Sequence, residues 1–319
     1  MTRFRGPWAS VTVVLITALL VWIPRPSGSS PSGTGLAPGP QLFATLGKPP
    51  IGVAVTSSRV LMTMFNQDKV RQIDSSGNVS DFAILPTTGR HVERYIAIAT
   101  GVGCFPKDYV YATVGQTVYR ITPDGSTVTK FVTLPSLPNG ETGITFDTVG
   151  TFNYRMILTD RRGPVWTVDC RGRATQVADA GEQIEGPMVA ALSFGRYAGD
   201  ILVGNEFQDE ILAIDPSGGV HIVASSESPE GLILVPPTVC NMGSSGGAYF
   251  VAIQGTNPDF KNQVYEFDAS NFTGLNDNVL VPSELTTQIN LLHADGSIST
   301  FWLPFAEPNL EGSAFAPCA

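Results

Sequence analysis

One short turn recurs along most of the chain at a nearly constant interval, and this repeat constrains the fold more than any other feature. Each copy begins with a hydrophobic residue, usually contains Asp and ends with Gly or, once, Asn. The clear copies occupy residues 73–77, 121–125, 168–172 and 214–218, and weaker copies occupy residues 267–271 and 292–296. The final residue needs a positive φ, which Gly and Asn tolerate best. The turns therefore mark equivalent points of a structural repeat.

Short strands of alternating hydrophobic and polar residues flank these turns. Residues 117–120 and 164–167 precede a turn, and residues 79–85 and 128–134 follow one. A repeat in the forties with about four strands per unit is typical of the blades of a β-propeller. We therefore expect an all-β fold in which four-stranded blades surround a central channel.

The inventory of strands predicts six blades. Innermost strands are recognised at residues 52–55, 95–98, 143–146, 186–189 and 231–234. The interval between the last two turns is too short by two strands, one outermost and one innermost. Residues 41–46 resemble an outermost strand and residues 312–315 an innermost one, so we expect both termini to close the ring. The sequence leaves open which blade each terminal strand joins. A closed ring lacks long free edges, and we expect a monomer.

The first 40 residues differ from the repeat. Arg3 and Arg5 precede an apolar run at residues 11–23, which has the length of a signal-peptide core and is short for a membrane-spanning helix. Residues 24–40 are rich in Pro, Gly and Ser, which predicts a linker. We therefore assign residues 1–23 to a signal peptide or membrane anchor, 24–40 to the linker and 41–319 to the propeller. The expected location is secreted, periplasmic or anchored outside the membrane.

Four cysteines in an exported chain suggest two disulfides. Cys104, Cys240 and Cys318 each follow an innermost strand, and Cys170 lies in one of the repeated turns. In a propeller these positions share one face. Pairing between neighbouring blades favours Cys104–Cys170 and Cys240–Cys318, although four cysteines allow three pairings.

The charge of the chain bears on its partners. The net charge is −9, and 15% of the residues are charged. Because phosphate binding needs a basic surface, this balance argues against a nucleic-acid partner. It is compatible with cation binding and with simple solubility.

A carboxylate stands just before the innermost strand in four of the blades, at Glu141, Glu185, Glu230 and Glu311. Innermost strands line the channel, so these side chains should converge on one axis at the face opposite the cysteines. Converging carboxylates repel one another and are driven to take up protons unless a cation compensates them. Ca²⁺, which prefers oxygen ligands, is the expected ion.

Two further side chains, Glu93 and Asn139, lie near the same rim and could add ligands. Two alternatives stay open. The glutamates could accept hydrogen bonds from backbone amides at the channel mouth, or they could bind a substrate without a metal.

The segments Glu185-Gly186-Pro187 and Leu137-Pro138-Asn139-Gly140, together with the Asp-x-x-Gly turns, resemble the six-bladed propellers of the gluconolactonase/regucalcin and strictosidine-synthase-like group. Propellers of the virginiamycin-lyase and NHL types share the rhythm of the turns. In the lactonase branch, a Glu, two Asn and an Asp hold a divalent metal, and the Asp also acts as the base. The resemblance implies Glu185 as the Glu ligand.

The Asn positions of the lactonase branch differ in this chain. Glu141, Glu230 and Glu311 stand at comparable places, and Asn139 is displaced by an extra Glu-Thr before its strand. This difference argues against lactonase activity but not against the propeller.

Three functions fit these observations, and the sequence does not decide whether the chain is an enzyme. The first is an exported propeller whose carboxylate cluster binds a divalent cation and holds a small-molecule or protein ligand. The second is a metal-dependent hydrolase of lactones or related esters with Glu141 or Glu230 as general base. The third, by resemblance, is a lyase of the virginiamycin type with His91 as the base. We favour binding, because no complete catalytic set can be assembled.

Overall fold

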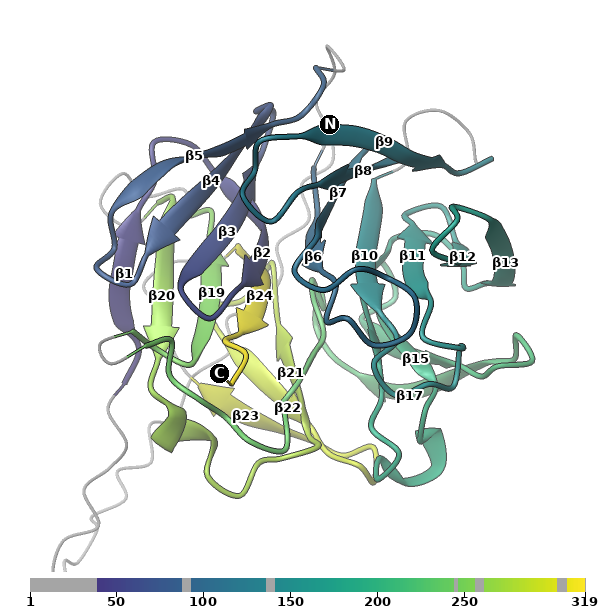
Figure 1. Cartoon of the computed structure of the whole chain (residues 1–319). Coiled ribbons are helices and arrows are strands. Elements are labelled where there is room, and N and C mark those ends of the chain that lie inside the picture. The colour runs from purple at the N-terminus through teal and green to yellow at the C-terminus, as the bar shows by residue number, and fades with distance from the viewer. Residues whose placement is uncertain are drawn as a thin grey trace, which may run out of the picture. The chain divides into compact units, whose positions relative to one another are not determined.

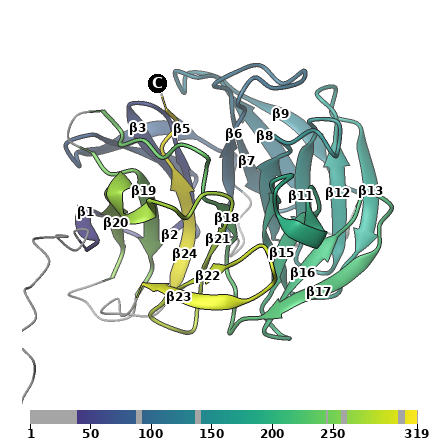
Figure 2. The ribbon, with the colours of Figure 1, turned by 90° about the horizontal axis from the view of Figure 1, so that it is seen from below.

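A computed structural model describes residues 39–87, 93–135, 141–243, 246–255, 261–302 and 309–318. These residues form six four-stranded antiparallel blades arranged in a ring, which confirms the expected six-bladed β-propeller (Figures 1 and 2). His91, Asn139, the expected signal or anchor at 1–23 and nearly all of the linker at 24–40 lie outside the described residues. Among the described residues, no helix has both the length and the apolar character needed to cross a bilayer.

Four consecutive blades follow the order of the chain, each from its innermost to its outermost strand. The first is β2 (Pro50–Val55), β3 (Arg59–Met64), β4 (Lys69–Asp74) and β5 (Val79–Ile84); the second is β6 (Ile96–Ile98), β7 (Val110–Val114), β8 (Thr117–Ile121) and β9 (Val128–Thr133). The third is β10 (Thr142–Phe146), β11 (Met156–Asp160), β12 (Pro164–Val168) and β13 (Ala174–Asp179); the fourth is β14 (Ile184–Val189), β15 (Ile201–Asn205), β16 (Glu210–Ile214) and β17 (Val220–Ser225).

The last two blades are interleaved along the chain. The fifth is β18 (Ile233–Leu234), β21 (Val279–Pro282), β22 (Ile289–Leu292) and β23 (Ile298–Trp302). The sixth is β24 (Leu310–Phe315), β19 (Tyr249–Ile253), β20 (Gln263–Phe267) and β1 (Gln41–Thr45). The chain therefore leaves the fifth blade after one strand, builds the middle of the sixth and then returns. Two 3₁₀ turns complete the elements, η1 (Gly195–Tyr197) and η2 (Ala269–Phe272).

Both terminal strands belong to the sixth blade, which answers the question that the sequence left open. β24 pairs with β19 on the channel side, and β1 pairs with β20 on the outside. Figure 2 shows the yellow β24 beside the green β19. The strand at residues 231–234 belongs to the fifth blade, whereas the turn at 267–271 follows β20 of the sixth. The spacing of the repeat did not reveal this difference, because it gives the positions of turns and not the pairing of strands.

Hydrophobic clusters fill the spaces between neighbouring blades. Tyr111, Phe146 and Trp166 pack between the second and third blades, and five further clusters occupy the other blade interfaces. The second strand of each blade is covered on both faces, as in the fully buried β7 and β11. This double burial explains why these strands are nearly continuous apolar runs.

Five of the six repeated turns have the predicted backbone; the prediction is wrong for Asn271, which lies in η2 and has no positive φ. Gly77, Gly125, Gly172, Gly218 and Gly296 all have a positive φ between 77° and 90°. Each also lies against the outer strand of the preceding blade: a Cβ on Gly125 would be 2.2 Å from the Phe82 carbonyl oxygen, and one on Gly77 would be 2.6 Å from that of Phe43. Glycine is therefore needed for conformation and for close approach.

The two expected disulfides are present, Cys104–Cys170 and Cys240–Cys318. The first joins the second and third blades. The second joins the segment that leaves β18 to the segment that follows β24, so it ties the C-terminus to the closing blade. Two disulfides are typical of proteins from oxidising compartments.

We predict that the Cys240–Cys318 disulfide, called the closing disulfide below, stabilises the ring. The double substitution Cys240→Ser/Cys318→Ser should lower the free energy of unfolding by about 2–4 kcal/mol, and the thermal midpoint by roughly 5–10 °C, because it frees the innermost strand of the sixth blade. Thermal unfolding measured by circular dichroism would check this. Cys104→Ser/Cys170→Ser is the matched variant, and an unchanged midpoint in Cys240→Ser/Cys318→Ser would contradict a closing role.

Candidate functional site: an acidic cluster at the neck of the channel

The six innermost strands approach one another closely where they begin, and glycine makes this approach possible. A Cβ on Gly186 would be 2.4 Å from the Gly231 Cα, and one on Gly312 would be 3.1 Å from the Gly52 Cα. Gly143 faces Pro187 in the same way, at 2.7 Å. A Cβ on Gly143, Gly186 or Gly312 does not fit at such distances, so neighbouring innermost strands meet closely at this level of the channel, which we call the neck.

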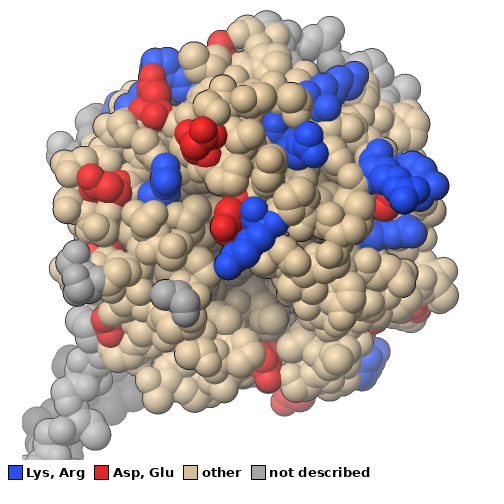
Figure 3. Space-filling view, viewed as in Figure 1, with Lys and Arg blue, Asp and Glu red and all other residues tan. Residues whose placement is uncertain are grey.

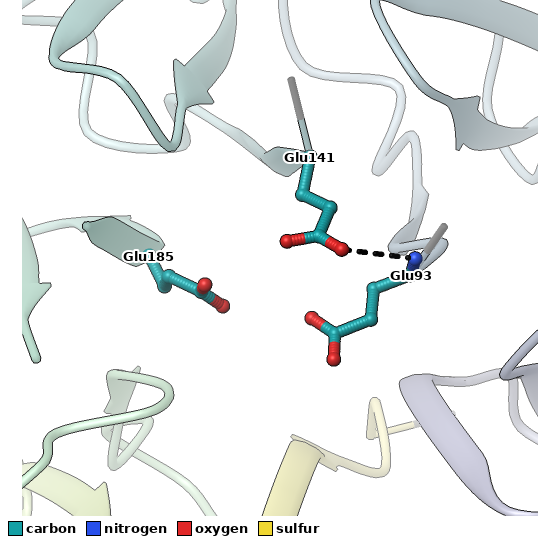
Figure 4. A group of neighbouring side chains, drawn as sticks. All are labelled: Glu93, Glu141 and Glu185. Atoms are coloured by element: carbon teal, nitrogen blue, oxygen red, sulfur yellow. Dashed lines mark hydrogen bonds between the residues drawn. The ribbon is translucent and has the colours of Figure 1, made fainter. Parts of the chain in front are cut away.

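The carboxylates predicted from the sequence stand directly above this neck. Glu185, Glu230 and Glu311 each precede a neck glycine and are buried, with 3%, 3% and 1% exposure. Glu93 and Glu141 begin the second and third blades. Carboxylate oxygens of Glu93, Glu141 and Glu185 lie within 4.8 Å of one another, and Figure 4 shows the three side chains pointing into one space.

We call Glu93, Glu141, Glu185, Glu230 and Glu311 the acidic cluster, together with three further side chains beside them that the sequence analysis missed. Arg161, Glu206 and Glu284 lie in the turns after the second strands β11, β15 and β21. Glu206 has a carboxylate oxygen within 4.8 Å of oxygens of Glu185 and Glu230, so Glu185 is common to two groups of three acids. The repeat could have revealed these residues, because they occupy the same position in successive blades.

Arg161 is the cation of this cluster. Its guanidinium forms an ion pair with Glu141, and it lies 3.4 Å from Glu185 (Nε to Oε1) and 3.6 Å from Glu206 (Nη2 to Oε2). Its Nε also donates to the Gln183 side chain at 2.5 Å. Among the described residues, the acids of the cluster form ion pairs with Arg161 alone. One guanidinium leaves most of the negative charge unbalanced.

Tyr95 occupies the neck position of the second blade, where other blades have glycine. Its hydroxyl lies within hydrogen-bonding distance of Glu185, of Glu93 at 3.1 Å and of Glu230 at 3.2 Å. A phenol has one proton to donate. The remaining contacts between these oxygens are favourable only if some carboxyl groups carry protons or a cation is bound.

Burial and mutual repulsion raise the pKa of several members. Burial, followed by the charge of Glu141, raises the pKa of Glu93 to about 7. Burial, with repulsion from Glu284, raises the pKa of Glu206 to about 7. The pKa values of Glu185, Glu230 and Glu311 are all raised well above the ordinary value, first by burial and then by neighbouring acids.

The arrangement fits a hard divalent cation. All donors of the two groups are carboxylate oxygens, the ligand type that Ca²⁺ prefers. They are held by separate strands and turns of a closed ring, so the positions of their backbones are fixed before any ion binds. Glu311 adds a buried acid on the same wall, where its Oε1 accepts a hydrogen bond from Gln254 at 2.8 Å.

Without a cation, the cluster should make stability fall as pH rises. The pKa of Glu93 and Glu206 is about 7 in the folded protein, against 4.5 for an ordinary Glu, so the folded state binds more protons between these values. Their stabilising contribution is complete below pH 4.5 and is lost as pH rises through 7.

In EDTA, the thermal midpoint should therefore fall by roughly 5 °C or more between pH 5 and pH 8. The exposed aspartates with lowered pKa values, such as Asp124 and Asp215, titrate below this range. A midpoint that rises from pH 5 to pH 8 would contradict the protonated cluster.

Comparison with known proteins supports the fold. No protein-family model matches the chain, and no curated protein sequence matches it. Among solved structures, a PQQ-bound aldose sugar dehydrogenase from Streptomyces coelicolor is similar, with a TM-score of 0.55, 12% identity and 87% of each chain covered. A candidate gluconolactonase also has a TM-score of 0.55, with 9% identity, 84% of this chain and 82% of that chain covered.

A catalytically inactive variant of virginiamycin B lyase from Staphylococcus aureus, solved with quinupristin, has a TM-score of 0.50 and 18% identity. The matched region covers 82% of this chain and 73% of the lyase chain. At these identities the likeness concerns the β-propeller fold alone.

Proposed function

We propose that the acidic cluster binds a divalent cation, with Ca²⁺ as the preferred ion, and that the bound cation holds a small-molecule or protein ligand at this face of an exported, monomeric propeller. The observation that carries the proposal is the central place of Glu185. This buried carboxylate belongs to both groups of three acids and contacts both Arg161 and Tyr95.

The charge of the cluster supports this assignment. Burial, and then repulsion between neighbouring acids, raises the pKa of Glu185 and of Glu230 well above the ordinary value. A divalent cation removes the repulsion and takes the place of the bound protons. Binding near pH 7 should therefore release protons, which a ligand that bound elsewhere would not do.

Cation binding should depend on Glu185 and not on nearby surface charge. Glu185→Gln removes the charge shared by the two groups and should weaken Ca²⁺ binding by about 100-fold or more. Glu182→Gln, an exposed residue on the same segment, should leave binding unchanged.

Isothermal titration of chelator-treated protein with Ca²⁺ and with Zn²⁺, in buffers of different ionisation enthalpy, would measure affinity and proton release together. Failure of wild-type protein to bind either ion at millimolar concentration would reject the proposal. Equal effects of the two substitutions would reject the site.

A second candidate function is hydrolysis of a lactone or related ester. A pKa of about 7 suits a carboxylate to general acid–base catalysis near neutral pH, and Glu93 and Glu206 have such values. When bound, a divalent cation would supply polarisation of the ester carbonyl. Glu206 would then accept a proton from the attacking water. Of the bases suggested by the sequence, Glu141 forms a close ion pair with Arg161 and Glu230 lies 3.2 Å from the Tyr95 hydroxyl. Glu206 has a longer contact with Arg161, at 3.6 Å.

If the chain is a hydrolase, Glu206→Gln should lower kcat for its lactone substrate by about 100-fold or more, while Glu182→Gln should keep full activity. A panel of simple lactones, assayed with Ca²⁺ present, would provide the measurement, and kcat should fall at acid pH, where Glu206 takes up a proton. Inactivity of the wild-type protein on the whole panel would favour binding or the lyase. The lyase candidate His91 lies outside the described residues.

A further inference from the structure

A large cavity opens on the face opposite the acidic cluster. It has a volume of about 1000 Å³, and Cys318 of the closing disulfide lies in its wall. The loops and turns that carry both disulfides surround this face. Figure 3 shows a hollow near the middle of the face that is seen in Figure 1. The volume lies at the upper end of the range found for small-molecule sites.

Tyr95 lies where this cavity meets the acidic cluster. The cavity ends at Tyr95 and Glu230, beside the neck glycines Gly52, Gly186 and Gly312. Tyr95 is 8% exposed, and its hydroxyl is held on the acidic side by Glu93, Glu185 and Glu230. The acidic cluster therefore lies at the inner end of the cavity, and Glu230 belongs to both.

The lining of the cavity is mainly apolar. Ile98, Leu234 and Phe315 are half-buried side chains in its wall, so each has apolar surface in contact with solvent. Charged side chains are placed near the mouth, in the loops after the innermost strands. Lys107 and Asp108 are exposed there, and the Arg59 guanidinium is engaged by Gln72.

The innermost strands also offer hydrogen-bonding groups. Each innermost strand is the end member of its sheet, so it pairs with one neighbour and its other edge faces the channel. Such an edge carries unpaired backbone N–H and C=O groups. The cavity thus combines apolar side chains with regularly placed backbone donors and acceptors, as in many sites for organic ligands.

We propose that this cavity is a second ligand site, which binds an uncharged and mainly apolar organic molecule with amide or hydroxyl groups. The apolar surface of the ligand would cover the exposed parts of Ile98, Leu234 and Phe315. Its polar groups would pair with the free strand edges. The site goes beyond the proposed function and does not require the cation.

Gly231 offers a direct way to block the site. It lies in the wall of the cavity, has no positive φ, and a Cβ there would have no heavy atom within 4 Å. Gly231→Phe therefore places a large side chain inside the cavity without an immediate clash. Gly47 is equally open but is exposed near the outer strand β1, so Gly47→Phe is the matched control.

The probe is Nile red, an uncharged apolar dye whose fluorescence increases in an apolar site. Wild-type protein should bind it at micromolar concentration with a 1:1 stoichiometry, both in EDTA and in Ca²⁺. Gly231→Phe should weaken binding by about tenfold or more, and Gly47→Phe should not change it. Ala97→Leu, at a half-buried position of the wall, should weaken binding in the same direction and decides the question if Gly231→Phe does not fold.

Three results would overturn the proposal: no binding by the wild-type protein, binding that Gly231→Phe and Ala97→Leu leave unchanged, or equal loss in Gly47→Phe. The second would place the dye on exposed apolar residues such as Phe207 or Leu192. Because the dye needs no metal, failure here leaves the cation site untouched, and loss of cation binding in Glu185→Gln leaves the dye result untouched.

Discussion

The close approach of the innermost strands at the neck is the constraint on which the rest of the site depends. The Gly186–Gly231 and Gly312–Gly52 contacts leave no space for a side chain on Gly186 or Gly312, so the residues just before the innermost strands are brought into one small volume. Glutamates at these positions become neighbours even though Glu141, Glu185, Glu230 and Glu311 are separated by 44, 45 and 81 residues in the sequence. The repeat thus brings equivalent positions of separate blades into a dense cluster of charge.

Two side chains of different chemistry, the guanidinium of Arg161 and the hydroxyl of Tyr95, hold this cluster together. Arg161 balances part of the charge from the side, and the Tyr95 hydroxyl connects three acids across the axis. Buried charges need such partners, because the interior does not replace water as a solvent for them. The raised pKa values show that the partners present in the chain are insufficient, which is the physical basis for expecting a cation or retained protons.

Much of the fold could be predicted from the sequence, because each blade repeats the same turn. The Asp-x-x-Gly turns located the blades, and the positions of Cys104, Cys170, Cys240 and Cys318 gave the disulfides. The gathering of Glu141, Glu185, Glu230 and Glu311 followed from their common place before innermost strands.

The remaining features are weaker in the sequence or depend on contacts that no local pattern records. Arg161, Glu206 and Glu284 occupy equivalent turns after second strands, but the residue type changes from Arg to Glu, so the repeat marks their position without indicating their role. Tyr95 is visible in sequence only as one more strand residue, and its role at the neck emerges when the surrounding glycines are placed in space. The interleaving of the last two blades concerns strand partners, which a turn spacing does not encode.

The sixth blade contains both the first and the last strand of the ring, and this has a consequence for folding during synthesis. Gln41 pairs with Glu266, so β1 leaves the ribosome long before its partner exists, and β24 is made after all the other strands of the ring. An early strand without its partner is an open edge that attracts wrong contacts. A chain that stopped short of β24 would keep its ring open, and Cys240 would lack its own thiol partner. Synthesis of β24 is thus a condition for native assembly of the ring.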